Sequence, residues 1–582
     1  MSILASLVRA YDRLPDAPAI GYSAEKIGFL ISLNADGSVA SVVDLRTGEG
    51  RKKTPRIVVV PQSVKRASGI SSNFLWDKTS YVLGVTAGEG RRLVEEHAAF
   101  VRWHQEALQN QTDEGLRAFV LFLQSWAPDH FISPLWPDEM KDQNVMFCLE
   151  RERLPHVMLH DRPAAQAVWQ KLSTAAAPSN RICLVTGEAG PVARLHPSIK
   201  GVWGGQSSGG AIVSFNLDAF ESYGHEQGDN AQISEVATFK YTTALNRFLG
   251  NDSGHRIQIG DASTVFWADA SDPQLAAEAE SLFLQWVSLS DDEAAATKKI
   301  ADKLSQIRAG RPLGEIEPML EGVRFHVLGL APNAARISIR FYFEDSFGVL
   351  TKNYQRYLQD MALEPAPREL YPPLWRYLVD LAVLGKRENI PPNLSGEWMR
   401  AILSGTRYPM TLLSTVLLRI RSDGGVGALR VAILRSLLVR NFHLAKEAPV
   451  ALDTENTNRG YLLGRLFAVY ERVQLAALGD VNASIKDKFY GSASAQPRKI
   501  FPMLDSGSAN HLSKLGKQSS GYRVVLERTI AAIMDMMTPV SDPFPASLSA
   551  QEQALFGLGY YHQRNEFFRK SSNAAKAEED AA

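Results

Sequence analysis

The sequence GVRFHVLGLAPNAARISIRFYF, residues 322–343, contains the last strong β-strand pattern along the chain. Residues 322–330 and 335–343 are rich in β-branched and aromatic residues, which favours two strands, and Ala331-Pro332-Asn333 between them favours a connecting turn. We therefore expect a pair of adjacent strands here. After Phe343 this pattern stops, so the segment marks the end of the β-containing part of the protein.

Residues from 346 onward show helical spacing of apolar residues, interrupted by proline and glycine. Helices are predicted over residues 400–420, 427–444, 460–478 and 521–537. Their lengths are typical of a helical bundle.

The part of the chain before residue 322 mixes both kinds of element. Residues 27–33 and 38–45 predict a β-hairpin around Asn34-Ala35-Asp36-Gly37, with Ile27, Phe29, Ile31 and Leu33 on one face. An amphipathic helix is predicted within residues 1–16. Further strands are predicted over 56–61, 81–85, 181–185 and 211–216, and further helices over 91–109, 115–126, 234–249 and 273–286.

The fold class that follows is α+β: a mixed α/β N-terminal and central region with short strands, followed by an all-α C-terminal helical bundle. Three regions are expected: a basic N-terminal α+β region over 1–125, a central α+β region over 126–345, and the helical bundle over 346–582.

The composition excludes some classes of protein. The 582 residues include 63 Lys plus Arg and 63 Asp plus Glu, so the formal net charge is zero. This balance argues against a protein that coats nucleic acid with its whole surface, but it allows local basic patches. Two cysteines, Cys148 and Cys183, are too few for a disulfide framework or a four-cysteine zinc site. No apolar run approaches the roughly 18 residues that span a bilayer, so we expect a cytoplasmic protein without a membrane partner.

A first basic stretch lies within residues 46–66. Seven cations stand against the single acid Glu49, a local charge of +6: Arg46, Arg51, Lys52, Lys53, Arg56, Lys65 and Arg66. So many cations cannot all find carboxylates locally, whereas nucleic-acid phosphates would satisfy them. The alternative is a solvated charged face.

A small polar loop follows, Ala67-Ser68-Gly69-Ile70-Ser71-Ser72-Asn73. Glycine allows the backbone to approach a groove closely, and an Asn amide can both donate to and accept from a base edge. Phosphate contacts fix register while polar tips read bases, so this order along the chain suits a nucleic-acid reader. In the alternative, the loop is a surface turn in which Asn73 caps its own backbone.

A second basic patch lies in the helical part, where residues 400–445 hold seven arginines against the one acid Asp423: Arg400, Arg407, Arg419, Arg421, Arg430, Arg435 and Arg440. The last three are five residues apart, so successive side chains are rotated by about 140° and do not form one stripe. Planar guanidinium groups suit bidentate contacts. The alternative to nucleic-acid binding is pairing with neighbouring helices.

The sequence around each candidate enzyme motif lacks features that the motif requires. Gly205-Gln206-Ser207-Ser208-Gly209 matches G-x-S-x-G, but that motif must open a helix, and a β-prone run follows here. His156 and His160 have the spacing of zinc ligands on a helix, yet Pro155 interrupts the segment and no Glu follows His156. No G-K-[ST] completes a phosphate-binding loop. We predict no catalytic residue, no metal and no cofactor.

Several longer runs carry a family resemblance. The central run is GGQSSGGAIVSFN (204–216), continued by FESYG (220–224), QGDNA (227–231), YTTALN (241–246), IGD (259–261) and TVFW (264–267). NFLWD (73–77) with YVLG (81–84), and RIRSD (419–423) with Arg430 to Arg440, fit the same pattern. The chain resembles the Csd family, the large (Cas-eight-c) subunit of the type I-C CRISPR surveillance complex, Cascade.

The resemblance implies a non-enzymatic subunit of a ribonucleoprotein complex in antiviral defence. It would read a protospacer-adjacent motif in duplex DNA, promote R-loop formation, hold the displaced strand and help recruit the helicase-nuclease. The implied partners are guide CRISPR RNA, target double-stranded DNA, the Cascade backbone and small subunits, and the helicase-nuclease effector. The C-terminal helical region would also resemble the small subunit, for which Met399 and Met410 are possible internal starts.

Within that role, the basic patches receive specific expectations. Motif reading falls to Gly69, Ser71, Ser72 and Asn73, phosphate binding to Lys52, Lys53, Arg56, Lys65 and Arg66, and displaced-strand binding to Arg419, Arg421, Arg430, Arg435 and Arg440. The glycine run 204–210 is expected to form tight turns that brace the motif-reading loop, with direct DNA contact as the alternative. Other functions that stay open are a scaffold that binds only protein and guide RNA, and a hydrolase built on Ser207.

Overall fold

The computed structural model describes residues 2–15, 17–48, 53–64, 66, 69–174, 180–259, 262–287, 298–479, 481–537 and 542–579. The chain forms two compact units. The first comprises Met1–Lys200 with Ser208–Arg247, and the second comprises Gly201–Ser207 with Phe248–Ala582. The three-region division at 125 and 345 stays a prediction.

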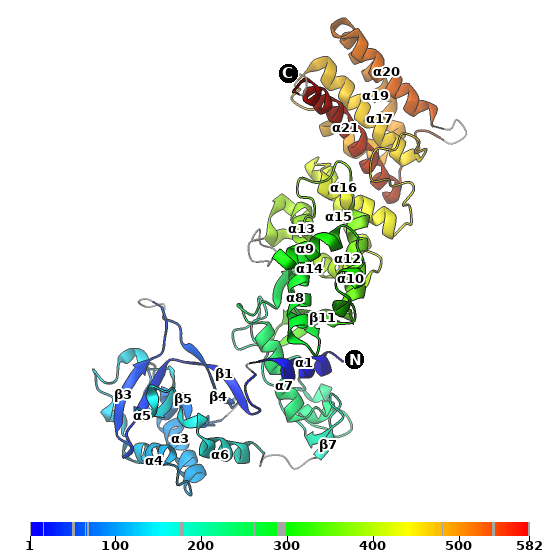
Figure 1. Cartoon of the computed structure of the whole chain (residues 1–582). Coiled ribbons are helices and arrows are strands. Elements are labelled where there is room, and N and C mark those ends of the chain that lie inside the picture. The colour runs from blue at the N-terminus through cyan, green and yellow to red at the C-terminus, as the bar shows by residue number, and fades with distance from the viewer. Residues whose placement is uncertain are drawn as a thin grey trace. The chain divides into compact units, whose positions relative to one another are not determined.

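The first unit is built on a four-stranded mixed sheet in the order β3-β2-β6-β5 (Figure 1). β2 (Phe29–Leu33) pairs antiparallel with β3 (Val39–Asp44), which confirms the predicted hairpin. β2 also pairs in parallel with β6 (Asn144–Leu149), and β6 pairs antiparallel with β5 (Trp76–Lys78). β1 (Tyr22–Ile27) and β4 (Arg56–Pro61) form a separate antiparallel ribbon.

All five residues of β2 are buried. Successive side chains point to opposite faces of a sheet, so both faces of this strand are covered. Phe29, Ile31 and Leu33 pack into the larger core cluster of this unit, whereas Leu30 packs on the other face. Ile27 was expected on the face of Phe29 but lies with Leu30. The alternation of side chains between the two faces is not continuous from Ile27 to Phe29, because β1 ends at Ile27 and β2 begins at Phe29.

Helices cover the face of the sheet that carries Phe29 and Ile31. α3 (Leu93–Leu108) and α4 (Glu114–Ser125), both predicted, contribute apolar side chains to this cluster, and α6 (Pro163–Thr174) follows β6 (Figure 1). The strand predicted over 81–85 is wrong, because Tyr81 and Val82 belong to the short helix α2 (Thr79–Val82). A short apolar run does not distinguish a buried helical turn from a strand.

The remainder of the first unit packs around two predicted helices, α1 (Ile3–Arg13) and α7 (Glu235–Phe248). Tyr11 meets Phe239 edge to face with ring centroids 5.7 Å apart. β7 (Asn180–Ile182), shorter than predicted, pairs with β8 (Ala189–Pro191). The strand predicted over 211–216 is wrong: this segment forms only isolated bridges, at Ala211 and between the preceding Gly210 and Ile199.

The second unit contains an antiparallel sheet in the order β12-β11-β10-β9. Its strands are β9 (Arg256–Ile259), β10 (Ala262–Asp269), β11 (Arg324–Asn333) and β12 (Arg336–Ser346). The predicted strand pair at 322–343 is therefore confirmed. Its turn is not at Ala331-Pro332-Asn333, as predicted: these residues continue the β11 ladder, and the chain turns at Ala334 and Ala335, where Ala334 has a φ of 52°. A bulge after Gly329 interrupts its register, and a Cβ at Gly329 would lie 2.3 Å from the Phe341 ring.

After Ser346 the described residues form helices and no strand, which confirms the predicted division between the β-containing and all-α parts. The predicted helix over 400–420 is two helices, because Gly405 adopts a positive φ of 67° and Pro409 precedes the next helix. The helices of this unit are α8 (Pro273–Val287), α9 (Lys298–Arg308), α10 (Leu313–Ile316), α11 (Pro318–Glu321), α12 (Phe347–Met361), α13 (Leu374–Leu381), α14 (Pro392–Ser404), α15 (Met410–Asp423), α16 (Ala428–Arg440), α17 (Arg459–Leu478), α18 (Ile485–Ala495), α19 (Pro497–Gln518), α20 (Ser520–Asp535) and α21 (Ala550–Glu579).

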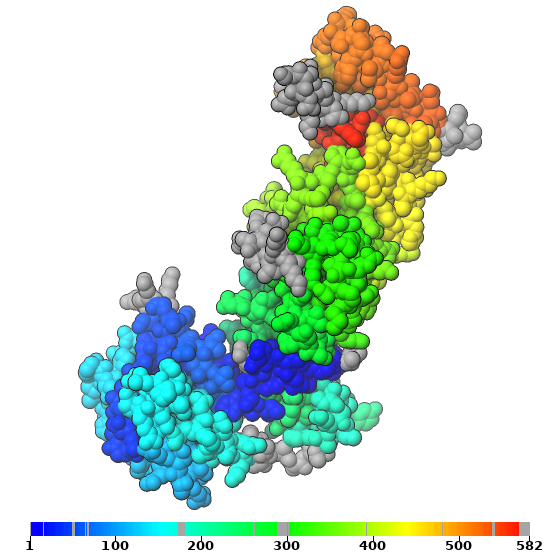
Figure 2. All heavy atoms as spheres, viewed as in Figure 1, coloured from blue at the N-terminus to red at the C-terminus, as the bar shows by residue number. Residues whose placement is uncertain are grey.

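One hydrophobic core runs through the second unit from the sheet to α21. In Figure 2, the atoms of the green and yellow-green middle part of this unit form one continuous surface. α17 and α21 approach most closely at glycines: a Cβ at Gly464 would lie 2.0 Å from the Phe556 carbonyl oxygen. Among the described residues, no helix is both long and apolar enough to cross a bilayer.

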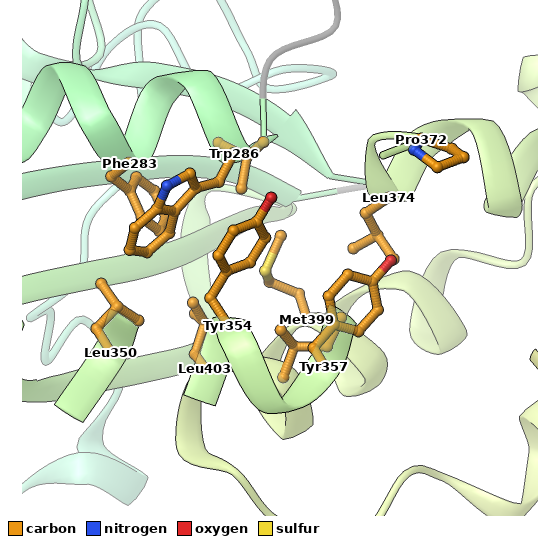
Figure 3. A pocket seen from close by; sticks show the side chains of 11 residues that line it. Phe283, Trp286, Leu350, Tyr354, Tyr357, Pro372, Leu374, Met399 and Leu403 are labelled. Carbon is orange, nitrogen blue, oxygen red and sulfur yellow. The ribbon is translucent and has the colours of Figure 1, made fainter. Parts of the chain in front are cut away.

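Figure 3 shows a small apolar cavity inside this core, lined by side chains that include Trp286, Tyr354, Tyr357 and Met399. Its volume is about 30 Å³. Trp286 stacks on Tyr354 with ring centroids 4.6 Å apart. The size and lining fit a packing gap between helices rather than a ligand site.

Candidate nucleic-acid interface

The small polar loop leads from the β4 ribbon strand to β5 and is anchored at its C-terminal end. Phe74 and Leu75 are completely buried. The Leu75 N–H donates to Nε2 of His104 on α3 at 2.9 Å. Because Nε2 accepts this N–H it carries no proton, so the imidazole is neutral, and its Nδ1–H donates to the Phe100 carbonyl at 2.8 Å. Burial lowers the pKa of His104 to about 3.

A buried carboxylate holds the loop from below. Asp77 is 0% exposed, and its Oδ2 accepts the Asn73 N–H at 2.9 Å and forms an ion pair with Arg66. The Arg66 Nε donates to the Ser71 carbonyl at 2.7 Å, and its guanidinium lies 3.9 Å from the centroid of the Tyr81 ring. Burial raises the pKa of Asp77, and Arg66 opposes that rise. Arg66 therefore clamps the loop in place.

The four residues expected to read bases divide into two pairs. Gly69 and Ser71 are exposed, and nothing lies within 4 Å of a Cβ placed on Gly69. Ser72 and Asn73 are buried, and Asn73 is 4% exposed with its Oδ1 accepting the Val64 N–H at 2.9 Å. This contact is of the kind expected if Asn73 caps local backbone. A base-reading role for Asn73 stays a prediction, and in this conformation its side chain supports the loop.

The expected phosphate-binding cations also differ in their surroundings. Arg56 is exposed and makes no ion pair with a described residue. Lys53 pairs with Asp44 at 2.9 Å, and Arg46 pairs with the same carboxylate at 2.8 Å. Asp44, two residues before the basic stretch begins, thus neutralises part of it. Lys52 and Lys65 lie outside the described residues, as do Arg51, Ser68 and residues 260 and 261 of the family motif.

Three of the five C-terminal arginines are buried within the helical region. Arg440 is 2% exposed, pairs with Asp360 at 2.6 Å and lies 4.4 Å from the Tyr408 ring centroid. Arg430 joins Asp380 at 3.1 Å and Asp423 at 2.9 Å. Arg435 donates to four backbone carbonyls, those of Gln359, Asp360, Ala448 and Pro449. This is the helix-pairing alternative, and DNA contact by these three would require them to leave these partners.

Exposed arginines of the same patch surround α15. Arg400, Arg407 and Arg421 are exposed, while Arg419 is mostly covered and pairs with Asp423 at 3.4 Å. Arg421 donates to Gln553, and Arg407 lies 3.5 Å from Nε2 of His443. None of the three exposed arginines forms an ion pair with a carboxylate in the described ranges. Sequence reasoning included Arg400 and Arg407 in the patch but not in the DNA-contacting set.

The rejected enzyme motifs remain unsupported by their surroundings. The G-x-S-x-G segment lies in turns, with neither a strand directly before it nor a helix directly after it. His160 is buried, with Nε2 3.0 Å from the Val59 carbonyl oxygen, and His156 occupies a turn with φ 59°. Across the described ranges, no three His, Cys, Asp or Glu side chains gather as metal ligands.

The glycine run does form turns. Gly201, Gly204 and Gly209 all have positive φ. Within the second unit, the Trp203 N–H donates to Ser263 at 2.8 Å, and Gly204 lies against Pro332 near the end of β11. A bracing role for the motif-reading loop stays a prediction.

Sequence reasoning missed the residues that support the loop. Asp77, Tyr81 and His104 hold Arg66, Asn73 and Leu75 in place. Asp77 could have been suspected, because an acid directly after the apolar run Phe74-Leu75-Trp76 is buried with it and then requires a cationic partner.

Over nearly its whole length the chain matches a known protein family. A family model with the description CRISPR-associated protein (Cas_Csd1) matches residues 7–568. The match spans both the clamped loop and the arginine-rich helices. No curated protein matches the chain.

Proposed function

The chain belongs to the Cas_Csd1 family of CRISPR-associated proteins, and on that premise we propose that it is the non-catalytic large subunit of a type I-C RNA-guided complex. In this role it reads a short motif in duplex DNA beside the target, promotes R-loop formation and holds the displaced strand. It also contributes to recruiting the helicase-nuclease. Guide RNA base pairing then supplies the rest of the sequence selection.

The observation that carries the proposal is the clamped loop. Gly69 and Ser71 are exposed at its surface, while Arg66, Asp77 and Asn73 fix its backbone from inside. The described segment Gly69–Asn73, held in this way, brings backbone donors and a hydroxyl close to base edges with little ordering entropy lost on binding. Ser71 is therefore the first candidate for base contact, with Ser72 and Asn73 positioning it.

Cations near the loop supply affinity that does not depend on sequence. Arg56 has no carboxylate partner among the described residues, so it can meet a phosphate without breaking an ion pair. Lys53 must exchange Asp44 for a phosphate. Lys52, Lys65 and Arg66 complete the proposed phosphate-binding set. Each true phosphate contact adds about 0.9 to the slope of log affinity against log salt concentration.

The displaced strand is assigned to the exposed side of α14 and α15. Arg400, Arg407 and Arg421 present charge there without a carboxylate partner in the described ranges. Sequence-tolerant binding of single strands requires such a positive surface. Arg419 extends it, whereas Arg430, Arg435 and Arg440 support the helices beneath.

The test uses the complex assembled with its guide RNA and a pool of duplexes in which the bases beside the guide-matched segment are randomised. We expect the wild-type complex to enrich particular flanking bases, and Ser71→Ala to reduce that enrichment by about tenfold. Arg56→Ala should weaken binding to all members alike and flatten the salt dependence. Ser506→Ala, an exposed serine on α19, is the matched control.

Asn73→Ala separates the two interpretations of that residue. A lower thermal stability with unchanged enrichment identifies it as a positioning residue, and lost enrichment at unchanged stability identifies it as a reader. If the wild-type complex enriches no flanking bases at all, the chain is instead a scaffold that binds protein and guide RNA.

A further inference from the structure

The loop between residues 216 and 231 presents apolar side chains to solvent. Tyr223 is 100% exposed, Leu217 is 57% exposed and Phe220 is 37% exposed. Single exposed apolar residues are common, but three large ones on one short loop are not, and such clusters mark interaction surfaces. This loop contains the FESYG and QGDNA runs, whose role the proposed function does not account for.

Tyr223 is held in an unfavourable backbone conformation. It occupies a tight turn in which the His225 N–H donates to the Ser222 carbonyl at 3.0 Å, and Tyr223 and Gly224 have φ of 54° and 72°. Positive φ is rare for a bulky L-residue and costs free energy that the surrounding structure must offset. Glycine or asparagine would fit this position without that cost.

The side chain of Asn230 holds the turn in this shape. Its Oδ1 accepts the Ser222 N–H at 3.0 Å, and its Nδ2 donates to the carbonyls of His225 at 2.9 Å and Gln227 at 3.0 Å. Next to it, Gly228 is packed so tightly that a Cβ would lie 1.9 Å from the Ala193 carbonyl oxygen. Arg194 donates to Gln227 at 2.7 Å. These contacts fix the backbone of the turn and so hold the Tyr223 side chain in its exposed position.

The charge around the loop restricts what can bind it. Between Lys200 and Lys240 the chain has no lysine or arginine but has five acids, Asp218, Glu221, Glu226, Asp229 and Glu235. Four of these acids lie on the loop itself, and they outnumber Arg194, the cation that contacts it at Gln227. Nucleic-acid phosphates are repelled by such a segment, so stacking of Tyr223 on a base is disfavoured. A protein surface with lysines or arginines around an apolar recess complements both features.

We propose that residues 217–226 form a docking loop for a basic protein surface, with the Tyr223 ring as the anchor. Aromatic anchors surrounded by charged rims carry much of the affinity in protein interfaces. RNA-binding backbone proteins have basic surfaces, so within the complex the partner would be the backbone protein; this choice rests on the proposed function.

The test measures binding of the full-length chain to the guide-RNA-loaded backbone assembly encoded with it, using interferometry. Tyr223→Gly removes the ring and suits the turn, so we expect it to weaken association about tenfold or more without lowering the melting temperature. Tyr223→Phe should retain most of the affinity. Glu221→Lys should weaken association and reduce its salt dependence. Leu154→Ala, at a residue 78% exposed elsewhere in the first unit, is the control.

Other outcomes overturn the inference. Unchanged association in Tyr223→Gly and Glu221→Lys contradicts the docking loop, even if motif enrichment on duplexes is intact. Loss of binding to naked guide RNA or naked duplex in Tyr223→Gly assigns the ring to nucleic acid instead. Tyr223-dependent assembly without motif enrichment upholds the loop and removes the proposed motif-reading function. Failure of the wild-type chain to assemble overturns both.

Discussion

Arg66 and Asp77 form an ion pair in which Asp77 is completely buried while the Arg66 side chain remains 25% exposed. The same carboxylate oxygen binds the Asn73 N–H, and the same guanidinium binds the Ser71 carbonyl. One ion pair therefore sets the path of the loop that we propose reads DNA. Because Asp77 is more deeply buried than Arg66, removing Arg66 should cost more stability than removing the charge of Asp77.

Arg66→Met should destabilise the first unit strongly at neutral pH, by about 3–5 kcal/mol, because it leaves a buried carboxylate without a counter-ion. Burial already raises the pKa of Asp77. In the variant, folding therefore favours the protonated carboxyl, and the loss of stability should shrink as the pH falls through that raised pKa. Urea unfolding at pH 7 and at pH 5 measures this, and an equal loss at both values would contradict it. Asp77→Asn should cost less, about 1–3 kcal/mol, because hydration of the partly exposed Arg66 continues.

His104 makes the first unit sensitive to acid. Its folded pKa is lowered to about 3 from an ordinary value of 6.5, so the unfolded chain takes up a proton first as the pH falls. Stability is therefore complete above pH 6.5 and is lost on acidification towards pH 3, by roughly 1.4 kcal/mol per pH unit. The difference in unfolding free energy between wild type and His104→Gln should narrow over this range. A constant difference would show that His104 is not the group responsible.

Arg440 and Arg421 should behave oppositely although they lie in the same basic patch. Arg440→Met leaves Asp360 buried without its partner and should cost about 3–5 kcal/mol of stability, with a matching fall in melting temperature. Arg421→Ala, at an exposed position, should change stability by less than about 0.5 kcal/mol but reduce the salt dependence of R-loop formation. A stable Arg440→Met protein with impaired R-loops would return Arg440 to the DNA-binding set.

Gly464 tests the close contact of α17 with α21. A Cβ there would lie 2.0 Å from a backbone oxygen, so Gly464→Ala should force the helices apart and cost about 3 kcal/mol, the upper end of the usual range for overpacking. Gly507→Ala is the matched control, because nothing lies within 4 Å of a Cβ at that helical position. It should stabilise the protein by about 0.5–1 kcal/mol through helix propensity. Thermal unfolding of both variants checks the pair.

The parts of the fold that sequence predicted well have local causes. The hairpin around Asn34–Gly37 follows from turn chemistry and side-chain alternation. The strand pair before Phe343 follows from its content of β-branched and aromatic residues, whereas its turn, at Ala334 and Ala335, was predicted three residues too early. The errors at 81–85 and 211–216 arise where an apolar run fits either helix, strand or turn. At 81–85, packing against the core selected the helix: Tyr81 and Val82 are buried as part of a helical turn.

The sequence by itself determined that a β-containing part ends near Phe343, that helices follow, and that cations gather at 46–66 and 400–445, because periodicity and composition are local properties. The tertiary structure alone decided which of those cations already have a carboxylate partner within the chain. Arg440 finds Asp360 and Arg430 finds Asp380, eighty and fifty residues away in sequence, while Asn73 turns inward to Val64. A buried charge needs a partner wherever the chain brings one, and no spacing along the sequence records where that partner will be.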